Sequence, residues 1–183
     1  MSVAICTHFK KLTDLSLPMI VNAVILEAQY TSTMIFVGRL GEAKYLGAAT
    51  VGNMLCNITG YSLAFGLCSA LDTLVSQAFG AKEYGLVGLH AQRAAVILTI
   101  FAIPVALVWW ETDWFVYNVM GIDKEISYFA GQWARWILLG LWPTLMFQVL
   151  RKLLQGCGIV WPVIVASFAA AVANVVSSYV MID

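Results

Sequence analysis

The sequence predicts an all-α integral membrane protein with about five transmembrane helices. Of its 183 residues, 61% are hydrophobic and only 11% are charged, whereas a soluble domain usually has about a quarter of its residues charged. The mean hydropathy is +0.85. The few charges also leave long intervals free, and roughly 20 apolar residues are enough for a helix to cross a hydrocarbon core of about 30 Å.

Five intervals along the chain reach that length or come close to it. In order, those with no charge or a single one are 15–38, 45–71, 94–110, 136–150 and 153–182. We therefore expect spans at approximately 15–37, 46–70, 92–111, 129–149 and 160–181, the fourth extending backwards past Arg135. The chain then consists of an N-terminal segment, 1–14, and a five-span membrane domain, 15–183.

The first span is expected to be a retained helix that starts from the cytosol. Lys10 and Lys11 precede it, but its apolar stretch is too long for a signal peptide and no A-x-A-like cleavage site follows. With the N-terminus in the cytosol, the inner segments carry six of the lysines and arginines, and the outer segments carry three or four. The positive-inside rule therefore favours a cytosolic N-terminus.

Several classes of function are excluded or disfavoured by what the chain lacks. The net charge is zero and no basic run exists, which argues against nucleic acid as a partner. The sequence contains no H-E-x-x-H, no G-x-S-x-G and no P-loop pattern, so we expect no enzyme. The four cysteines form no C-x-x-C pair and are expected to act as small buried hydrophobes. We expect no catalytic residue, no metal site and no cofactor.

Polar side chains inside the spans are the first candidates for function. In the second span Asn53 and Asn57 lie four residues apart on one helical face, as do Asn174 and Ser178 in the fifth. Hydrogen bonding between helices is the simpler interpretation of such residues. Glu27 is a carboxylate well inside a span, where ionisation costs roughly 2.5–3.5 kcal/mol, and it is a candidate protonatable site.

The segment between the second and third spans, 69–93, is expected to be structural. Asp72, Gln77, Lys82 and Arg93 are placed to pair across the inner ends of these two spans and hold them together. Gly80, Gly85 and Gly88 in the same segment suggest tight turns or a broken helix.

A set of motifs in this order resembles the eukaryotic branch of the MATE (multidrug and toxic compound extrusion) family. The segment ALDTLVSQAFGAK with QRA downstream is the most specific of them. The motifs are FVGRLG at 36–41, CNITGYS at 56–62, ALDTLVSQAFGAK at 70–82, QRA at 92–94 and LQGCGIVWP at 154–162. The resemblance extends from about residue 8 to the end of the chain.

This resemblance implies a secondary transporter of twelve helices in two lobes. Such a protein expels organic, often cationic, compounds in exchange for protons or sodium ions through a cavity between the lobes. The five spans correspond to most of the first lobe, and the second lobe is missing from this chain. The alternative is a membrane scaffold or a defective fragment that transports nothing.

The same resemblance names residues for the cavity. Asn57 matches the asparagine of the family's N-x-T-G segment, and Asn174 matches an asparagine of its fifth span. The positions of two aspartates of the bacterial branch are occupied here by Thr33 and Ser178, so the resemblance does not imply a bacterial-type cation site in this lobe. Glu27 does not replace them, because six residues from Thr33 correspond to about 240° around a helix.

Overall fold

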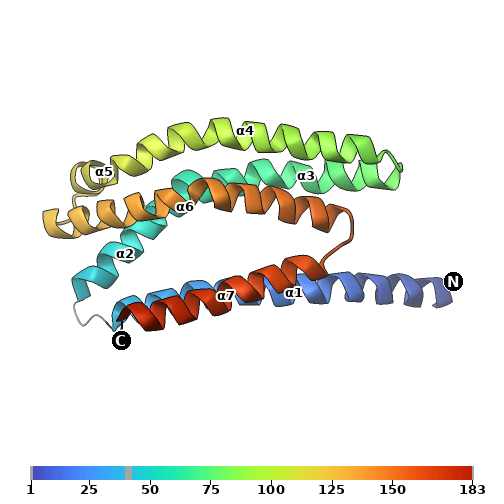
Figure 1. The fold of residues 1–183 in the computed structure, drawn as a ribbon, viewed down its shortest axis with the longest axis horizontal. Coiled ribbons are helices and arrows are strands. Elements are labelled where there is room, and N and C mark those ends of the chain that lie inside the picture. The colour runs from blue at the N-terminus through green and yellow to red at the C-terminus, as the bar shows by residue number, and fades with distance from the viewer. Residues whose placement is uncertain (1, 40–42, 183) are drawn as a thin grey trace. The chain divides into compact units, whose positions relative to one another are not determined.

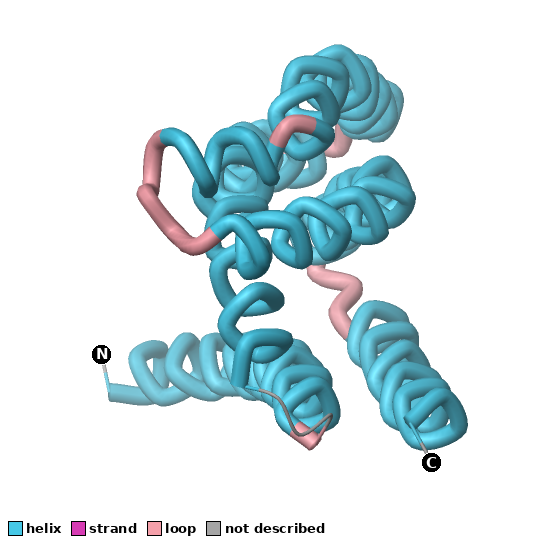
Figure 2. Tube along the Cα trace, turned by 90° about the vertical axis from the view of Figure 1, so that its left-hand side faces the viewer, coloured by secondary structure: helices cyan, strands magenta, loops and turns pink. Residues whose placement is uncertain are grey.

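The computed structural model describes residues 2–39 and 43–182, and all of its regular elements there are helices. Met1, the first residue of the expected N-terminal segment, and Asp183, the last residue of the expected membrane domain, lie outside the described residues. Five of the helical stretches are long and apolar enough to cross a membrane, as the composition predicts. In Figure 2 short loops join the helices. The elements are α1 (Ser2–Gly38), α2 (Ala43–Cys56), the π-helical segment η1 (Asn57–Tyr61), α3 (Ser62–Gly80), α4 (Tyr84–Trp110), α5 (Thr112–Asn118), α6 (Lys124–Gly156) and α7 (Trp161–Ile182).

The chain forms two compact units. The first consists of Met1–Phe36 and Gly158–Asp183, and the second of Val37–Cys157. The first unit therefore contains nearly all of α1 together with α7. These two helices run in the same direction in Figure 1, and a side-chain contact between Thr33 and Asn174 joins them.

The second unit is built on three long helices that contact one another, α3, α4 and α6 (Figure 1). Helix α2 packs against the first part of α6, and α5 packs there as well. The three long helices bring a stripe of buried side chains, spaced three or four residues apart, to a common core. In α3 this stripe consists of Ala64, Cys68, Leu71, Val75 and Ala78.

The opposite face of α4 carries apolar side chains that no other described part of its own unit covers. The exposed fraction is 59% for Val96, 62% for Ile100 and Ile103, and 67% for Leu107. Their spacing places them on one side of the helix. Such a face is unfavourable in water but matches the hydrocarbon of a bilayer, as expected for a membrane-crossing helix.

Several helices are longer than the charge-free intervals suggest. The second expected span, 46–70, lies within a helical stretch from Lys44 to Gly80 that includes η1. The third, 92–111, lies in a helix that already begins at Tyr84. The connection between them shortens to a turn over 81–83, in which Lys82 has a positive φ of 63°. Of the glycines expected to break the helix, Gly85 and Gly88 are helical and only Gly80 ends one.

Helix ends differ from the expected ends because a charge stops a hydropathy window but not a helix. Asp72 and Arg93 bound the charge-free intervals 45–71 and 94–110, yet both lie within helices. The backbone hydrogen bonds of a helix continue past the apolar region whenever the polar side chains reach water or a partner. The helix α5, within the loop expected between the third and fourth spans, was not predicted either.

Candidate functional site

In the first unit, two polar residues predicted from different spans meet. Thr33 Oγ1 on α1 lies 3.2 Å from Asn174 Oδ1 on α7 and 3.1 Å from the carbonyl oxygen of Gln29. A hydroxyl has one proton, so it can donate to only one of these acceptors at a time. Both side chains are half-buried. The pair therefore presents neutral dipoles, with spare capacity to accept a hydrogen bond, inside two candidate membrane spans.

An apolar groove of about 280 Å³ lies between the same two helices. Gln29, whose carbonyl faces Thr33, contributes to its wall on α1. Ala171, Val172, Val175 and Val176, on either side of Asn174 in the sequence, form its wall on α7. Small apolar walls beside a few polar groups are typical of sites that bind organic molecules. Neutral dipoles attract a cation without holding it as tightly as a carboxylate would.

Ser178 and Glu27 lie outside this contact. Ser178 follows Asn174 by one turn and is half-buried, and its hydroxyl has no hydrogen bond among the described residues. Glu27 is exposed. Its carboxylate forms no hydrogen bond or ion pair with the described residues, and its backbone carbonyl accepts a hydrogen bond from Thr31 Oγ1 at 2.9 Å. Helix geometry directs Glu27 away from Thr33, as the six-residue separation predicts.

Asn57 belongs to the second unit and begins the π-helical segment η1. Its side chain is exposed and its Oδ1 accepts a hydrogen bond from Ser62 Oγ at 3.0 Å. Two residues later, Thr59 Oγ1 accepts a hydrogen bond from Trp109 Nε1 of α4 at 3.0 Å. The inserted π turn shifts the register of the helix, and such turns often occur at functional positions. Asn57 is therefore exposed and accessible to a ligand, whereas Thr59 is hydrogen-bonded to Trp109 of α4.

The close packing around Gly60 explains why the N-x-T-G segment needs a glycine at this position. A Cβ atom at this position would lie 2.5 Å from Trp109 Cζ2 and 2.9 Å from Val105 Cγ1. Trp109 is completely buried, and Tyr61 packs edge-on against it with ring centroids 5.3 Å apart. Helix α4 can approach η1 this closely because residue 60 has no side chain.

Asp72 pairs with a residue that the sequence did not suggest. Its Oδ2 lies 2.6 Å from Nζ of Lys152 on α6, at the end of the unit where α3 and α4 are connected. Gln77, Lys82 and Arg93 form no side-chain hydrogen bond or ion pair within the described part of the chain. The charged contact at this end therefore joins α3 to α6, whereas the expected contact joined the second span to the third.

We expect that reversing the charge at Asp72 lowers the stability of the protein, and that also reversing the charge at Lys152 restores it. Because Asp72 is partly exposed, the pair should contribute only about 0.2–1 kcal/mol to the free energy of unfolding. Asp72→Lys should lower that free energy, and Asp72→Lys combined with Lys152→Asp should restore most of it. Unfolding in mixed detergent micelles, followed by circular dichroism, measures the free energy of unfolding of the wild type, the single variant and the double variant. Equal stabilities of the single and double variants would contradict the pairing.

Two buried amides escaped the sequence analysis. Asn22 is 2% exposed and Gln148 is 8% exposed, and among the described residues neither Asn22 Oδ1 nor Gln148 Oε1 has a hydrogen-bond partner. Neither has a second amide four residues away in its span, the spacing that singled out Asn57 and Asn174. A search for any amide within a charge-free interval would have found both. Among the described residues, no three His, Cys, Asp or Glu side chains gather in a group that could hold a metal ion.

Comparison with known proteins assigns this arrangement to a family. The MatE family model matches residues 18–180, most of the chain. The chain belongs to the MatE family. Among curated MatE relatives from Arabidopsis thaliana, Protein DETOXIFICATION 15 is 32% identical over 168 residues, which cover 92% of this chain and 35% of that protein. Protein DETOXIFICATION 14 is 34% identical over 169 residues, covering 91% and 34%.

A solved structure agrees with the MatE assignment. The crystal structure of the eukaryotic MATE transporter AtDTX14 matches with a TM-score of 0.85 and 31% identity, covering 93% of this chain and 38% of that chain. The resemblance to the eukaryotic branch and the all-helical fold are thus confirmed, and the fold corresponds to the N-terminal lobe of a MATE transporter. This MatE chain spans about a third of the length of the curated relatives it matches.

Proposed function

We propose that the protein containing this chain exports organic, often cationic, compounds in exchange for protons or sodium ions. The observation that carries the proposal is the MatE match over residues 18–180. The geometry of the first unit adds support, since Thr33 and Asn174 form a neutral polar contact beside an apolar groove within two candidate spans. In this proposal the chain supplies one lobe, and the cavity is completed by a second lobe. The protein resides in a plasma or vacuole-type membrane with its N-terminus in the cytosol.

The coupling ion follows from which groups within the spans can change charge. In the candidate spans of the first unit, Glu27 is the one carboxylate. Proton exchange through that unit would therefore use Glu27, whereas sodium coupling would use the oxygen atoms of Thr33, Asn174 and Ser178. Asn57 in the second unit is the remaining candidate for contact with substrate, because its side chain is exposed and, among the described residues, is hydrogen-bonded only to Ser62.

A transport assay tests the proposal. The complete product of the gene is produced in an efflux-deficient microbial host, and the release of preloaded ethidium and tetraphenylphosphonium is followed. We expect release above that of the empty host, abolished by a protonophore if protons drive it and by removal of sodium if sodium does. If the protein is present in the membrane but neither gradient drives release, the proposal fails and a non-transporting membrane scaffold becomes the better interpretation.

A further inference from the structure

A second groove lies in the second unit, between α3 and α4, and has no part in the proposed transport. Its volume is about 330 Å³. Its walls are mainly apolar, and those that matter here are Leu67 and Leu74 on α3 and Ile97 on α4. The polar side chains that line it, His90 and Arg93, both come from α4. They lie three residues apart and so share one face of the helix.

The groove has a basic end and an apolar end. Helices α3 and α4 are antiparallel and are connected at 81–83. Leu74 lies six residues before the end of α3 at Gly80, and His90 six residues after the start of α4 at Tyr84, so the two lie at the same level. Leu67 and Ile97 are both thirteen residues from those helix ends. The basic end is thus nearer the connection, and Ile97 at the apolar end lies about 10 Å beyond His90 and about 6 Å beyond Arg93 along the helix.

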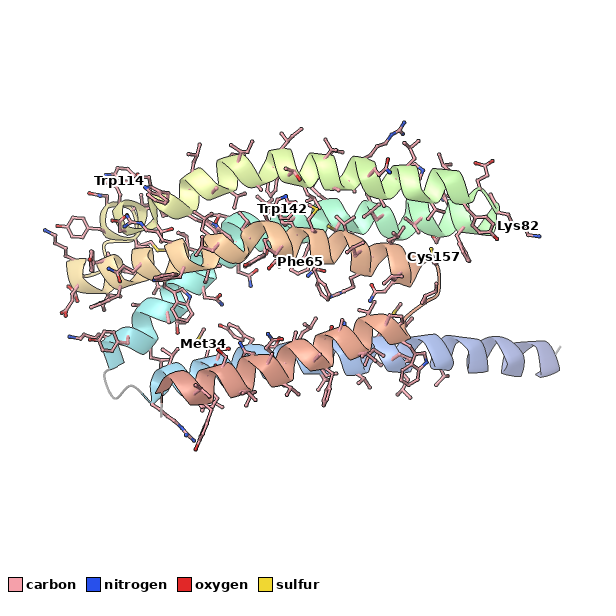
Figure 3. The ribbon with its side chains drawn as sticks, viewed as in Figure 1. Met34, Phe65, Lys82, Trp114, Trp142 and Cys157 are labelled. Atoms are coloured by element: carbon pink, nitrogen blue, oxygen red, sulfur yellow. The ribbon has the colours of Figure 1, made fainter. Side chains whose placement is uncertain are left out.

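The depth of Arg93 in a bilayer can be estimated from the length of α4. Trp110, whose side chain is exposed, ends this helix, and tryptophan is enriched at membrane interfaces. Arg93 precedes Trp110 by seventeen residues, or about 26 Å of helix, close to the roughly 30 Å of a hydrocarbon core. Arg93 therefore lies near the opposite interface, at the level of lipid phosphates. Figure 3 places Lys82, beside the connection, and Trp114 at opposite ends of this unit.

The side chain of Arg93 is available for a ligand. It is exposed, and within the described part of the chain it forms no ion pair or hydrogen bond. Of the two carboxylates near this end of the unit, Asp72 is already paired with Lys152, and Glu83, in the connection, does not line the groove. An arginine near the end of a membrane helix gains from an anionic partner, because its charge is costly within hydrocarbon. A guanidinium also matches the geometry of a phosphate.

We propose that the groove between α3 and α4 binds an anionic glycerophospholipid of the adjacent leaflet. Its phosphate contacts Arg93, and one acyl chain lies along Leu67 and Ile97. Basic pockets between membrane helices on the cytosolic side bind anionic headgroups in general. A free phosphate ion would leave the apolar walls uncovered, whereas a lipid satisfies both ends of the groove. The lipid is a structural ligand and is independent of the transport proposed above.

The experiment uses the full chain in detergent micelles, titrated with phosphatidylglycerol or phosphatidylcholine and analysed by native mass spectrometry. Loss of a charged hydrogen bond corresponds to about 1.5–3 kcal/mol, so Arg93→Gln should weaken phosphatidylglycerol binding about tenfold or more. Lys82→Gln is the matched control, since it removes the same charge near the same interface but does not line the groove. Millimolar inorganic phosphate should not displace the lipid.

A second variant tests the apolar wall of the groove, near the level of Arg93, without changing the charge. Ala70 is exposed and lines the groove, so Ala70→Leu fills space there and should also weaken binding of the lipid. Unchanged binding by Arg93→Gln or by Ala70→Leu would overturn the proposal. An equal loss in Lys82→Gln would do so as well, because it would indicate diffuse charge attraction. Equal affinity for phosphatidylcholine would indicate an ordinary annular lipid and would also overturn it.

Discussion

Gly60→Ala should destabilise the second unit although alanine is the better helix former. The new Cβ would lie 2.5 Å from Trp109 Cζ2 and 2.9 Å from Val105 Cγ1. Trp109 cannot easily move away, because it is fully buried and its Nε1 is bonded to Thr59. Overpacking of this kind costs about 1–3 kcal/mol, which exceeds the gain of up to about 1 kcal/mol in helix propensity.

The matched control for this substitution has the opposite expected sign. Gly66 lies on the same helical stretch, and a Cβ there would meet nothing within 4 Å. Gly66→Ala should therefore leave stability unchanged or raise it by up to about 1 kcal/mol. Reversible unfolding in mixed micelles, followed by circular dichroism, compares the two variants. If both behave alike, the close approach of α4 to η1 is not as described.

A double variant identifies the atoms responsible. Trp109→Phe removes the part of the indole that contains Cζ2, the nearest atom to the added methyl group. The cost of Gly60→Ala should consequently be smaller in the Trp109→Phe background than in the wild type. The contact with Val105 Cγ1 remains, so the rescue should be partial. Strict additivity of the two substitutions would show that the residues do not interact.

Asn174→Leu should reduce gradient-driven efflux by at least about tenfold while leaving the fold intact. Leucine is close to asparagine in size but cannot offer an amide to Thr33 or to a cation. The hydroxyl of Thr33 keeps the carbonyl of Gln29 as an acceptor at 3.1 Å, and hydrogen bonds between membrane helices average only about 0.6 kcal/mol. Loss of a dipole that contacts a charged ligand costs about 1.5–3 kcal/mol, which corresponds to a factor of 10 or more.

The measurement is the ethidium efflux assay in cells that produce equal amounts of each protein in the membrane. Ala173→Leu is the control, because it adds the same side chain at the adjacent, exposed position of α7. It should retain efflux. Thr33→Val should reproduce part of the loss caused by Asn174→Leu, since it removes the hydroxyl from the same contact. If Asn174→Leu shows wild-type efflux, the contact between Thr33 and Asn174 has no role in transport.

The class of protein and its five candidate membrane helices were predictable because both depend on local composition. A long charge-free interval can cross the hydrocarbon core of a bilayer as a helix, whatever the arrangement of the rest of the chain. The same reasoning did not place the helix ends, since Asp72 and Arg93 interrupt hydropathy but not backbone hydrogen bonding. The sequence singled out Thr33 through the family resemblance, and Asn174 through the resemblance and its spacing from Ser178. Neither observation shows that the two side chains touch.

Sequence alone therefore determined that this is a multi-pass membrane protein of the MatE family, together with most of its candidate polar residues. The tertiary structure decided which residues are partners: Thr33 with Asn174, Asp72 with Lys152, and Trp109 with Thr59. It also revealed the π-helical segment and the need for glycine at residue 60. The physical reason is that hydropathy acts residue by residue along the chain. Hydrogen bonds, ion pairs and close packing depend on which helix faces lie within a few ångströms of each other.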